Sequence, residues 1–204
     1  MLKCEQNELL LHKLVVEEKV DGANLGISFD HEGNMLVQNR GEYLHSPYSG
    51  QWKKLSEWLN PRTDMLFEQL TDKYILFGEW CYAEHSVGYD KLPDWFLGFD
   101  IFDKVTAKFF SCSRRNAMFD ALQIFHVPMI AQGNFTLSEL NNLLSQSQSQ
   151  LSDKLAEGLY LRFDQGDWLK QRAKLVRPGF IQSIEQHWSR SAIKANRLKR
   201  EVGI

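Results

Sequence analysis

EEKVDGAN, residues 17–24, places one lysine among three carboxylates. The runs before and after it, LVV at 14–16 and LGISF at 25–29, are apolar and typical of two β-strands. On an exposed surface the stretch would be an ordinary solvated charge cluster with a turn at Asp21-Gly22. Between two strands that need burial, the same turn directs Lys19 toward a ligand instead of solvent. A lysine that is buried, or that lies beside another cation, can lose its proton and act as a nucleophile.

The composition is that of an ordinary globular protein. The chain has 204 residues, 43% hydrophobic and 25% charged, which allows one sizeable domain with or without a short appendage. Its formal net charge of −2 argues against a protein that coats nucleic acid by bulk charge, but it allows a local basic groove. The three cysteines form no CxxC pair, so neither a zinc site nor a disulfide framework is indicated.

The surroundings of the protein follow from the same features. Unpaired cysteines fit a reducing compartment, so we expect a cytoplasmic protein. The sequence contains no apolar run long enough to cross a membrane, and its first residues lack the pattern of a signal peptide. We therefore expect no membrane partner.

Hydrophobic periodicity and turn residues predict strands before and after a helical middle. Helices are predicted over 50–71 with a break at Asn60-Pro61, from Ser113 to about residue 125, and after the capping-box spacing of Thr136 and Glu139. The low-complexity run SQSQSQ at 145–150 predicts a flexible surface loop. Strands are predicted at 14–19, 24–30, 35–39, 73–82, 95–102, 158–163 and 168–176.

This order of elements predicts an α+β domain with mainly antiparallel sheets over residues 1–178. The remaining residues, 179–204, are expected to form a short helical tail with a basic end. Such a tail is most simply a solvated helix face, and the alternative is contact with nucleic-acid phosphates.

Six short elements, taken in order, resemble the motifs of the covalent nucleotidyltransferases, which are the DNA ligases, RNA ligases and mRNA capping enzymes. Each element alone is too short to be specific, but coincidence would have to recur six times. KVDGAN, NRGE and the segment 82–103 are most similar to RNA ligases, specifically the bacterial and phage RNA-ligase-domain proteins. The elements are KVDG at 19–22, NRGE at 39–42, FGEW at 77–80, FDIFD at 99–103, AEGLYLR at 156–162 and LKQRAKLV at 169–176.

The resemblance implies a ligase-type adenylyltransferase domain whose antiparallel sheets flank a nucleotide cleft. It implies an ATP-dependent RNA ligase of the kind used in RNA repair. Lys19 would attack the α-phosphate of ATP to give lysyl-AMP and pyrophosphate. The AMP would move to a 5′-phosphate end, and a 3′-hydroxyl would displace it. Because only some thirty residues follow Lys174, we expect no OB-fold domain, which favours a minimal RNA ligase over a capping enzyme.

The resemblance also assigns catalytic and phosphate-binding roles. Lys19 is the expected nucleophile. Lys174 is the second catalytic residue, and it shares one face of a strand with Arg172, from which both could hold the α-phosphate. Many relatives have lysine where this chain has Arg172, so the role of Arg172 differs in detail. Glu157 is a hard oxygen ligand for Mg²⁺ or Mn²⁺ near the phosphates.

The remaining expected site residues contact the nucleoside. Glu17 or Glu18 would accept a hydrogen bond from the adenine amino group, and Asn24 belongs to the same motif. Phe99 would stack on the purine. Two further residues complete the set: Glu79 would accept from the ribose hydroxyls, and Arg40 would hold the ribose or the nucleic-acid 5′ end.

Three alternatives stay open from the sequence. One is a capping-type guanylyltransferase that uses GTP. Another is a non-catalytic nucleotide-binding or RNA-binding module of the same fold, although Lys19, Glu157 and Lys174 are all present. The third concerns the substrate, which could be DNA or a nicked duplex instead of RNA ends. A protein partner could also supply end recognition.

Overall fold

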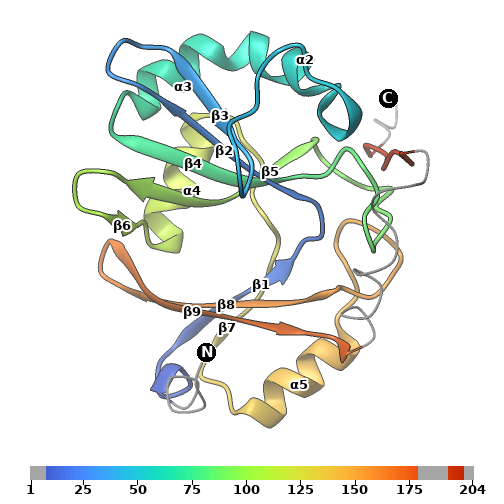
Figure 1. The fold of residues 1–204 in the computed structure, drawn as a ribbon. Coiled ribbons are helices and arrows are strands. Elements are labelled where there is room, and N and C mark those ends of the chain that lie inside the picture. Colours follow the sequence, from blue (N-terminus) through green and yellow to red (C-terminus); the bar gives the residue numbers. More distant parts are fainter. Residues whose placement is uncertain (1–7, 179–192, 200–204) are drawn as a thin grey trace, which may run out of the picture.

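The computed structural model describes residues 8–178 and 193–199, and it contains two antiparallel sheets, one above the other in Figure 1. The upper sheet has five strands in the order β3-β2-β4-β5-β6, and the lower has four in the order β7-β1-β8-β9. This confirms the expected α+β class. The upper strands are β2 (Ala23–Phe29), β3 (Met35–Gln38), β4 (Tyr74–Trp80), β5 (Phe96–Asp103) and β6 (Lys108–Phe109); the lower strands are β1 (Leu14–Lys19), β7 (Met129–Gly133), β8 (Gly158–Gln165) and β9 (Trp168–Val176).

The stretch EEKVDGAN is the link between the two sheets. Its first three residues end β1 in the lower sheet, and its last two residues begin β2 in the upper sheet. Only residues 20–22 lie between them. The charged stretch therefore separates two apolar strands because the chain changes sheets there.

Helices cover the outer faces of the two sheets (Figure 1). Above the upper sheet, Leu66 and Leu70 of α3 pack into a core with β2 and β4. Below the lower sheet, Leu140 and Leu144 of α5 pack against β1 and β8. The helical elements are η1 (Gly50–Trp52), α2 (Leu55–Leu59), η2 (Asn60–Arg62) and α3 (Thr63–Leu70) above, α4 (Cys112–Ala121) beside β5, and α5 (Leu137–Gln146) below.

Local sequence signals fixed most of these elements. The break at Asn60-Pro61 lies in η2, between α2 and α3. The Thr136 capping box is present: its hydroxyl accepts from the Glu139 amide, and the Glu139 carboxylate accepts from the Thr136 amide. The hairpin after β2 contains Gly33 with a φ of 85°, the left-handed region that glycine tolerates.

Two expectations about local structure were wrong. The α4 helix begins at Cys112, not after Ser113, because the Ser111 side chain accepts from the Arg114 amide and caps it. The edge strand β7 was missed, since its residues MIAQG carry a weak alternation. It is held as a strand by its pairing with β1.

The expected helical tail falls largely on residues 179–192 and 200–204, which lie outside the described residues. The described part, 193–199, is extended rather than helical. None of the helices in the described ranges is long and apolar enough to span a membrane.

Candidate active site

The turn after Lys19 is held by the side chain of Asp21. Its Oδ2 accepts from the backbone amides of Ser86 (2.6 Å) and Val87 (3.0 Å). The Asp21 amide in turn donates to the Tyr89 hydroxyl (2.8 Å). An aspartate suits this position because one carboxylate oxygen can accept from two amides at once. These contacts fix the direction of the chain two residues after Lys19.

Gly22 is required by close packing of the backbone. A Cβ at this position would lie 2.7 Å from the carbonyl oxygen of Trp80, a distance that no side chain tolerates. The Gly22 amide donates to Oε1 of Glu79 (3.2 Å). Burial raises the pKa of Glu79 to about 7, against the opposing effect of Lys19. Glu79 is therefore partly protonated near neutral pH.

Lys19 forms an ion pair with Glu157. Its Nζ lies 2.5 and 2.6 Å from the two carboxylate oxygens. The Lys19 side chain is 23% exposed and that of Glu157 is 3% exposed. Lys19 is in register with Gly158, where a Cβ would lie only 2.5 Å from the Leu175 carbonyl oxygen. The EG pair of the sequence thus brings the carboxylate opposite the lysine.

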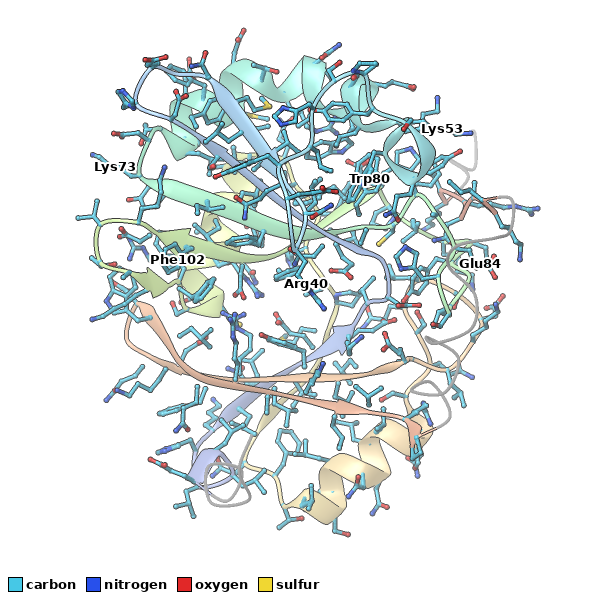
Figure 2. The ribbon with its side chains drawn as sticks, in the orientation of Figure 1. Arg40, Lys53, Lys73, Trp80, Glu84 and Phe102 are labelled. Carbon is cyan, nitrogen blue, oxygen red and sulfur yellow. The ribbon has the colours of Figure 1, made fainter. Side chains whose placement is uncertain are left out.

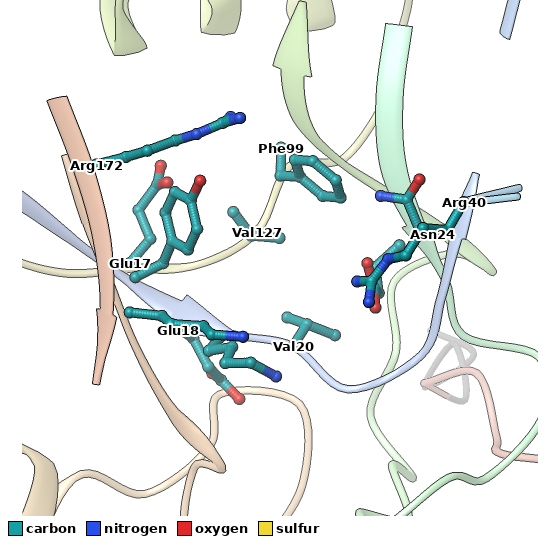
Figure 3. A pocket seen from close by; sticks show the side chains of 12 residues that line it. Glu17, Glu18, Val20, Asn24, Arg40, Phe99, Val127 and Arg172 are labelled. Carbon is teal, nitrogen blue, oxygen red and sulfur yellow. The ribbon is translucent and has the colours of Figure 1, made fainter. Parts of the chain in front are cut away.

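A cavity of about 330 Å³ lies beside this ion pair and takes its walls from both sheets. Figure 3 shows Glu17 and Arg172 on one side, Asn24 and Arg40 on the opposite side, and Phe99 between them. Nine of the ten expected site residues line the cavity, and the tenth, Glu157, contacts Lys19. The nine are Glu17, Glu18, Lys19, Asn24, Arg40, Glu79, Phe99, Arg172 and Lys174.

The upper wall combines acidic, amide and cationic groups. Asn24 of β2 is in register with Glu79 of β4, so their side chains are neighbours. Arg40 comes from the exposed turn after β3 and lies between the two sheets (Figure 2). Its charge acts on Glu79 in the direction of a lower pKa, although burial outweighs it.

The lower wall carries the cations of β9. Arg172 and Lys174 are two residues apart on the strand and both line the cavity, as the alternation of a strand requires. Arg172 donates to Oδ2 of Asp100 (2.7 Å), and its guanidinium lies 4.4 Å from the centre of the Phe109 ring. Arg172 is thus held in place from both sides, which a lysine could not reproduce.

Beneath the cavity lies a group of fully buried charges that we call the buried clamp: Glu17, Asp100, Arg115 and Arg162. Arg115 of α4 pairs with Glu17 of β1, and Arg162 of β8 pairs with Asp100 of β5. Each pair joins the lower sheet to the upper layer. Both arginines also donate to the carbonyl oxygen of Phe99, which fixes the backbone under that ring.

No local pattern in the sequence indicates this clamp. Arg115 lies in a helix with ordinary polar neighbours, and its partner Glu17 is 98 residues away. Both oxygens of the Glu17 carboxylate accept from Arg115, and Glu17 also lines the cavity, so its contact with adenine stays a prediction.

Glu18 is held by the loop that follows α5. Its carboxylate accepts from the Ser149 hydroxyl (2.5 Å) and the Gln150 amide (2.9 Å). Burial raises the pKa of Glu18, and these hydrogen bonds oppose that effect. The run at 145–150 is therefore not a flexible surface loop: its first two residues end α5, and Ser147 and Ser149 are buried. Ser149 donates to the site residue Glu18, whereas Ser145 and Ser147 donate to backbone carbonyls of α5.

Three further residues line the cavity that were not expected to do so. Val20 and Tyr160 lie within recognised motifs, next to expected residues, so the motifs could have indicated them. Val127 comes from the link between α4 and β7, where no sequence signal marked it. Burial raises the pKa of the Tyr160 phenol to about 12, so it stays protonated.

The side chains offer little for a metal ion by themselves. Within 8–178 and 193–199, no group of three or more His, Cys, Asp or Glu residues gathers as a protein-built metal site requires. Glu157 supplies one hard carboxylate at the cavity. That donor set suits a cation that arrives with its own oxygen ligands, as Mg²⁺ does with phosphates and water.

Comparison with known proteins now identifies the family. Among solved structures, the chain is similar to an RNA ligase of Naegleria gruberi with PPi (TM-score 0.71, 19% identity) and to a point mutant of that ligase with ATP and Mn (TM-score 0.64, 19% identity). The alignments cover 91% and 89% of this chain but 56% and 54% of those chains, so it spans about half of their length.

A search of curated proteins finds no match. The sequence profile of the RNA ligase family matches residues 12–176, which include both sheets and every cavity-lining residue. The chain belongs to the RNA ligase family.

Proposed function

We propose that the protein is an ATP-dependent RNA ligase that works through a lysyl-AMP intermediate. The observation that carries the proposal is the single cavity in which Lys19 meets Arg172 and Lys174. A lysine nucleophile and two phosphate-binding cations, all from the lower sheet, line one cavity, which is the arrangement that nucleotidyl transfer to lysine needs. Family membership and the structural match to a ligase with ATP and Mn support the choice of ATP.

In the first step, the neutral amine of Lys19 attacks the α-phosphorus of ATP. A nitrogen–phosphorus bond forms, the bond to the β-phosphate oxygen breaks, and pyrophosphate leaves; the lysine proton is released. Arg172 and Lys174 would stabilise the charge on the phosphate oxygens, since such steps depend on positioning and charge. The AMP then passes to a 5′-phosphate end, and a 3′-hydroxyl displaces it.

Lys19 must leave Glu157 before it can react. In the structure, both carboxylate oxygens contact the lysine Nζ, so the amine is held by Glu157 and is not free to attack phosphorus. We assign Glu157 as the ligand for Mg²⁺ or Mn²⁺, and a cation bound there supplies charge stabilisation to the phosphates.

The nucleoside contacts follow the walls of the cavity. Phe99 would stack on the purine, and Glu79 with Asn24 would contact the ribose. Glu17 or Glu18 would accept from the adenine amino group: both line the cavity, and Arg115 orients the first while Ser149 and Gln150 orient the second. Arg40, exposed at the open edge, would hold the ribose or the 5′ end of the RNA.

The substrate and the cellular setting complete the proposal. RNA ends are favoured by the family, with DNA ends or a nicked duplex as the alternative substrate. The absence of an OB-fold domain, a cytoplasmic location and a protein partner for end recognition all stay predictions. GTP-dependent capping is the competing activity, and its distinguishing feature is the nucleotide that labels Lys19.

The experiment is covalent labelling of the full chain. The protein is incubated with α-³²P-labelled ATP or GTP and Mg²⁺ or Mn²⁺, and separated on a denaturing gel. We expect label from ATP alone. Lys19→Arg is the sharpest variant, since arginine keeps the positive charge for Glu157 but stays protonated and cannot attack phosphorus. Lys73→Ala is the matched control. Lys73 is an exposed lysine directly before β4, and Figure 2 shows it well away from Arg40 of the cavity.

The outcomes distinguish an ATP-dependent ligase from a capping enzyme and from a non-catalytic binding module. Label from ATP that disappears in Lys19→Arg and persists in Lys73→Ala supports the lysyl-AMP step. Label from GTP alone would move the assignment to a capping-type guanylyltransferase. Absence of label with either nucleotide and either metal would contradict an autonomous enzyme and favour a binding module.

A further inference from the structure

The described C-terminal segment, residues 193–199, lies against the loop that follows β4, which we call the 81–92 loop. In Figure 1 the red segment runs beside this green loop. Backbone amides tie the two together: Asn196 donates to the Tyr82 carbonyl (2.9 Å), and Arg197 donates to the Tyr89 carbonyl (2.9 Å). The segment is therefore packed as part of the domain, although it is far from the site in sequence.

The side chain of Asn196 is the centre of this contact. It is buried, with 4% exposure. Its Nδ2 donates to the carbonyl oxygens of Cys81 (2.8 Å) and Ala83 (3.1 Å), and its Oδ1 accepts from the Tyr89 amide (2.8 Å). These partners lie at the beginning and near the end of the 81–92 loop. One amide group thus holds both sides of the loop, and it uses both of its donors and its acceptor in doing so.

The opposite side of the same loop holds the turn that follows Lys19. The amides of Ser86 and Val87 donate to Asp21, and the Tyr89 hydroxyl accepts from the Asp21 amide. Tyr89 is thus in contact with Asn196 through its backbone and with Asp21 through its side chain. A small core that includes Val20, Cys81, Val87 and Tyr89 fills the space between them. These hydrogen bonds and this core connect Asn196 to the lysine turn through the 81–92 loop.

We propose that Asn196 is a positioning residue for the Lys19 nucleophile. By holding the 81–92 loop in its observed shape, it fixes Asp21 and so the direction in which the Lys19 amine meets the α-phosphorus. The catalytic part of this inference rests on the proposed function. Asn196 does not line the cavity, and the cavity residues Phe99, Arg172 and Lys174 belong to other elements. Its loss should therefore slow the chemical step without weakening ATP binding.

The test is single-turnover labelling of full-length Asn196→Ala over a range of ATP concentrations. We expect the rate constant at saturating ATP to fall roughly 10- to 100-fold, as small misplacements of a nucleophile do. The half-saturating ATP concentration should change less than about threefold, and the final labelled fraction should stay at the wild-type value. The matched control is Asn141→Ala, an exposed asparagine on α5.

A merely structural role for Asn196 would give a different result. It would reduce the labelled fraction through loss of folded protein, while the surviving molecules would react at the wild-type rate. That result, or a wild-type rate with a wild-type fraction, would overturn the proposal.

The route through the loop can be tested with Tyr89→Phe, which removes only the hydroxyl that accepts from Asp21. We expect Tyr89→Phe as a single substitution to slow labelling. The double variant with Asn196→Ala should be no slower than the slower single variant, because both act on one connection. Slowing that multiplies in the double variant would contradict a route through the 81–92 loop.

Hydrogen exchange separates this inference from the proposed function, because it needs no ATP. Asn196→Ala should speed exchange at the amides of Ser86 and Val87, whereas Asn141→Ala should not. If the wild-type protein fails to label but exchange responds, the proposed function fails and the connection stands. If the wild type labels while neither rate nor exchange responds to Asn196→Ala, the inference alone fails.

Discussion

Glu17 and Lys19 are two residues apart on β1, and each is paired with an opposite charge, yet the two pairs differ in burial and in span. Glu17 and its partner Arg115 are 2% and 0% exposed, and they join the lower sheet to α4. Lys19 is 23% exposed at the edge of the cavity, and its partner Glu157 directly precedes β8 of the same sheet. The first pair is closed to solvent although Glu17 lines the cavity, whereas the second pair is partly exposed to a space that a ligand can enter.

This difference separates a structural charge from a reactive one. A buried pair that loses one partner leaves an unpaired charge in the protein interior, so it cannot exchange partners during a reaction. A pair beside an open cavity can be broken by a ligand that offers new partners. The neighbouring charges of EEKVDGAN look alike in the sequence, but only the lysine end of the stretch is free to do chemistry.

The largest expected effect comes from Lys19→Arg, which tests whether the open pair is chemical. Labelling with ATP should fall at least about a thousandfold, because the nucleophile is lost. The free energy of unfolding should change by less than about 1 kcal/mol, since arginine keeps a positive charge beside the Glu157 carboxylate. Urea unfolding of both proteins measures this. A large loss of stability would show that this pair is structural as well.

The converse variant, Arg115→Met, tests whether the buried clamp is structural. We expect it to lower the free energy of unfolding by about 3 to 5 kcal/mol, because the Glu17 carboxylate stays buried without its partner. Denaturant unfolding at neutral pH measures the change.

The double variant Glu17→Gln with Arg115→Met provides the control for that experiment. It removes both charges, so most of the lost stability should return. If the double variant is as unstable as the single one, lost packing and not the unpaired charge is responsible.

A third effect concerns Glu79 in the wall of the cavity, which should make the stability of the protein depend on pH. Burial raises its pKa from 4.5 in the unfolded chain to about 7 in the folded protein. Between these values the folded state binds more protons, so the free energy of unfolding should fall as the pH rises from 4.5 to 7. The contribution amounts to about 3 kcal/mol and levels off above that range.

Glu79→Gln should remove this pH dependence. The amide oxygen can still accept from Gly22, and no charge forms above pH 7. We expect the variant to be more stable than the wild type at pH 8 and less active in labelling. Thermal unfolding from pH 4.5 to 8 measures the difference between the two proteins. A difference that is independent of pH would mean that the pKa of Glu79 is not raised.

The smallest effect is expected for Arg172→Lys, because the substitution keeps the positive charge. Arg172 belongs to both regions. It contacts the buried Asp100 and also lines the cavity, and its side chain is 41% exposed. A lysine keeps the charge but loses the planar contact with Phe109, so stability should fall by about 1 kcal/mol or less. Labelling at saturating ATP should fall a few-fold. A loss as large as that of Lys19→Arg would give Arg172 an essential role.

Much of the fold could be predicted from the sequence because its signals are local. The strands were found within a few residues, since apolar runs and turn residues mark them. The missed strand β7 carries no strong local pattern, and its pairing with β1, more than 100 residues earlier, makes it a strand. Likewise the polar run at 145–150 was expected to be a surface loop, because nothing local shows that Glu18 will meet Ser149.

The sequence by itself determined the family, the position of Lys19 and nine residues of the cavity, because those residues stand in short motifs whose spacing is set within one strand or turn. Only the tertiary structure decided which charges are buried and which are open. Arg115 reaches Glu17 from 98 residues away, and Asn196 reaches Cys81 from 115 residues away. Such contacts depend on how separate elements pack together, and packing leaves no pattern in the sequence near either partner.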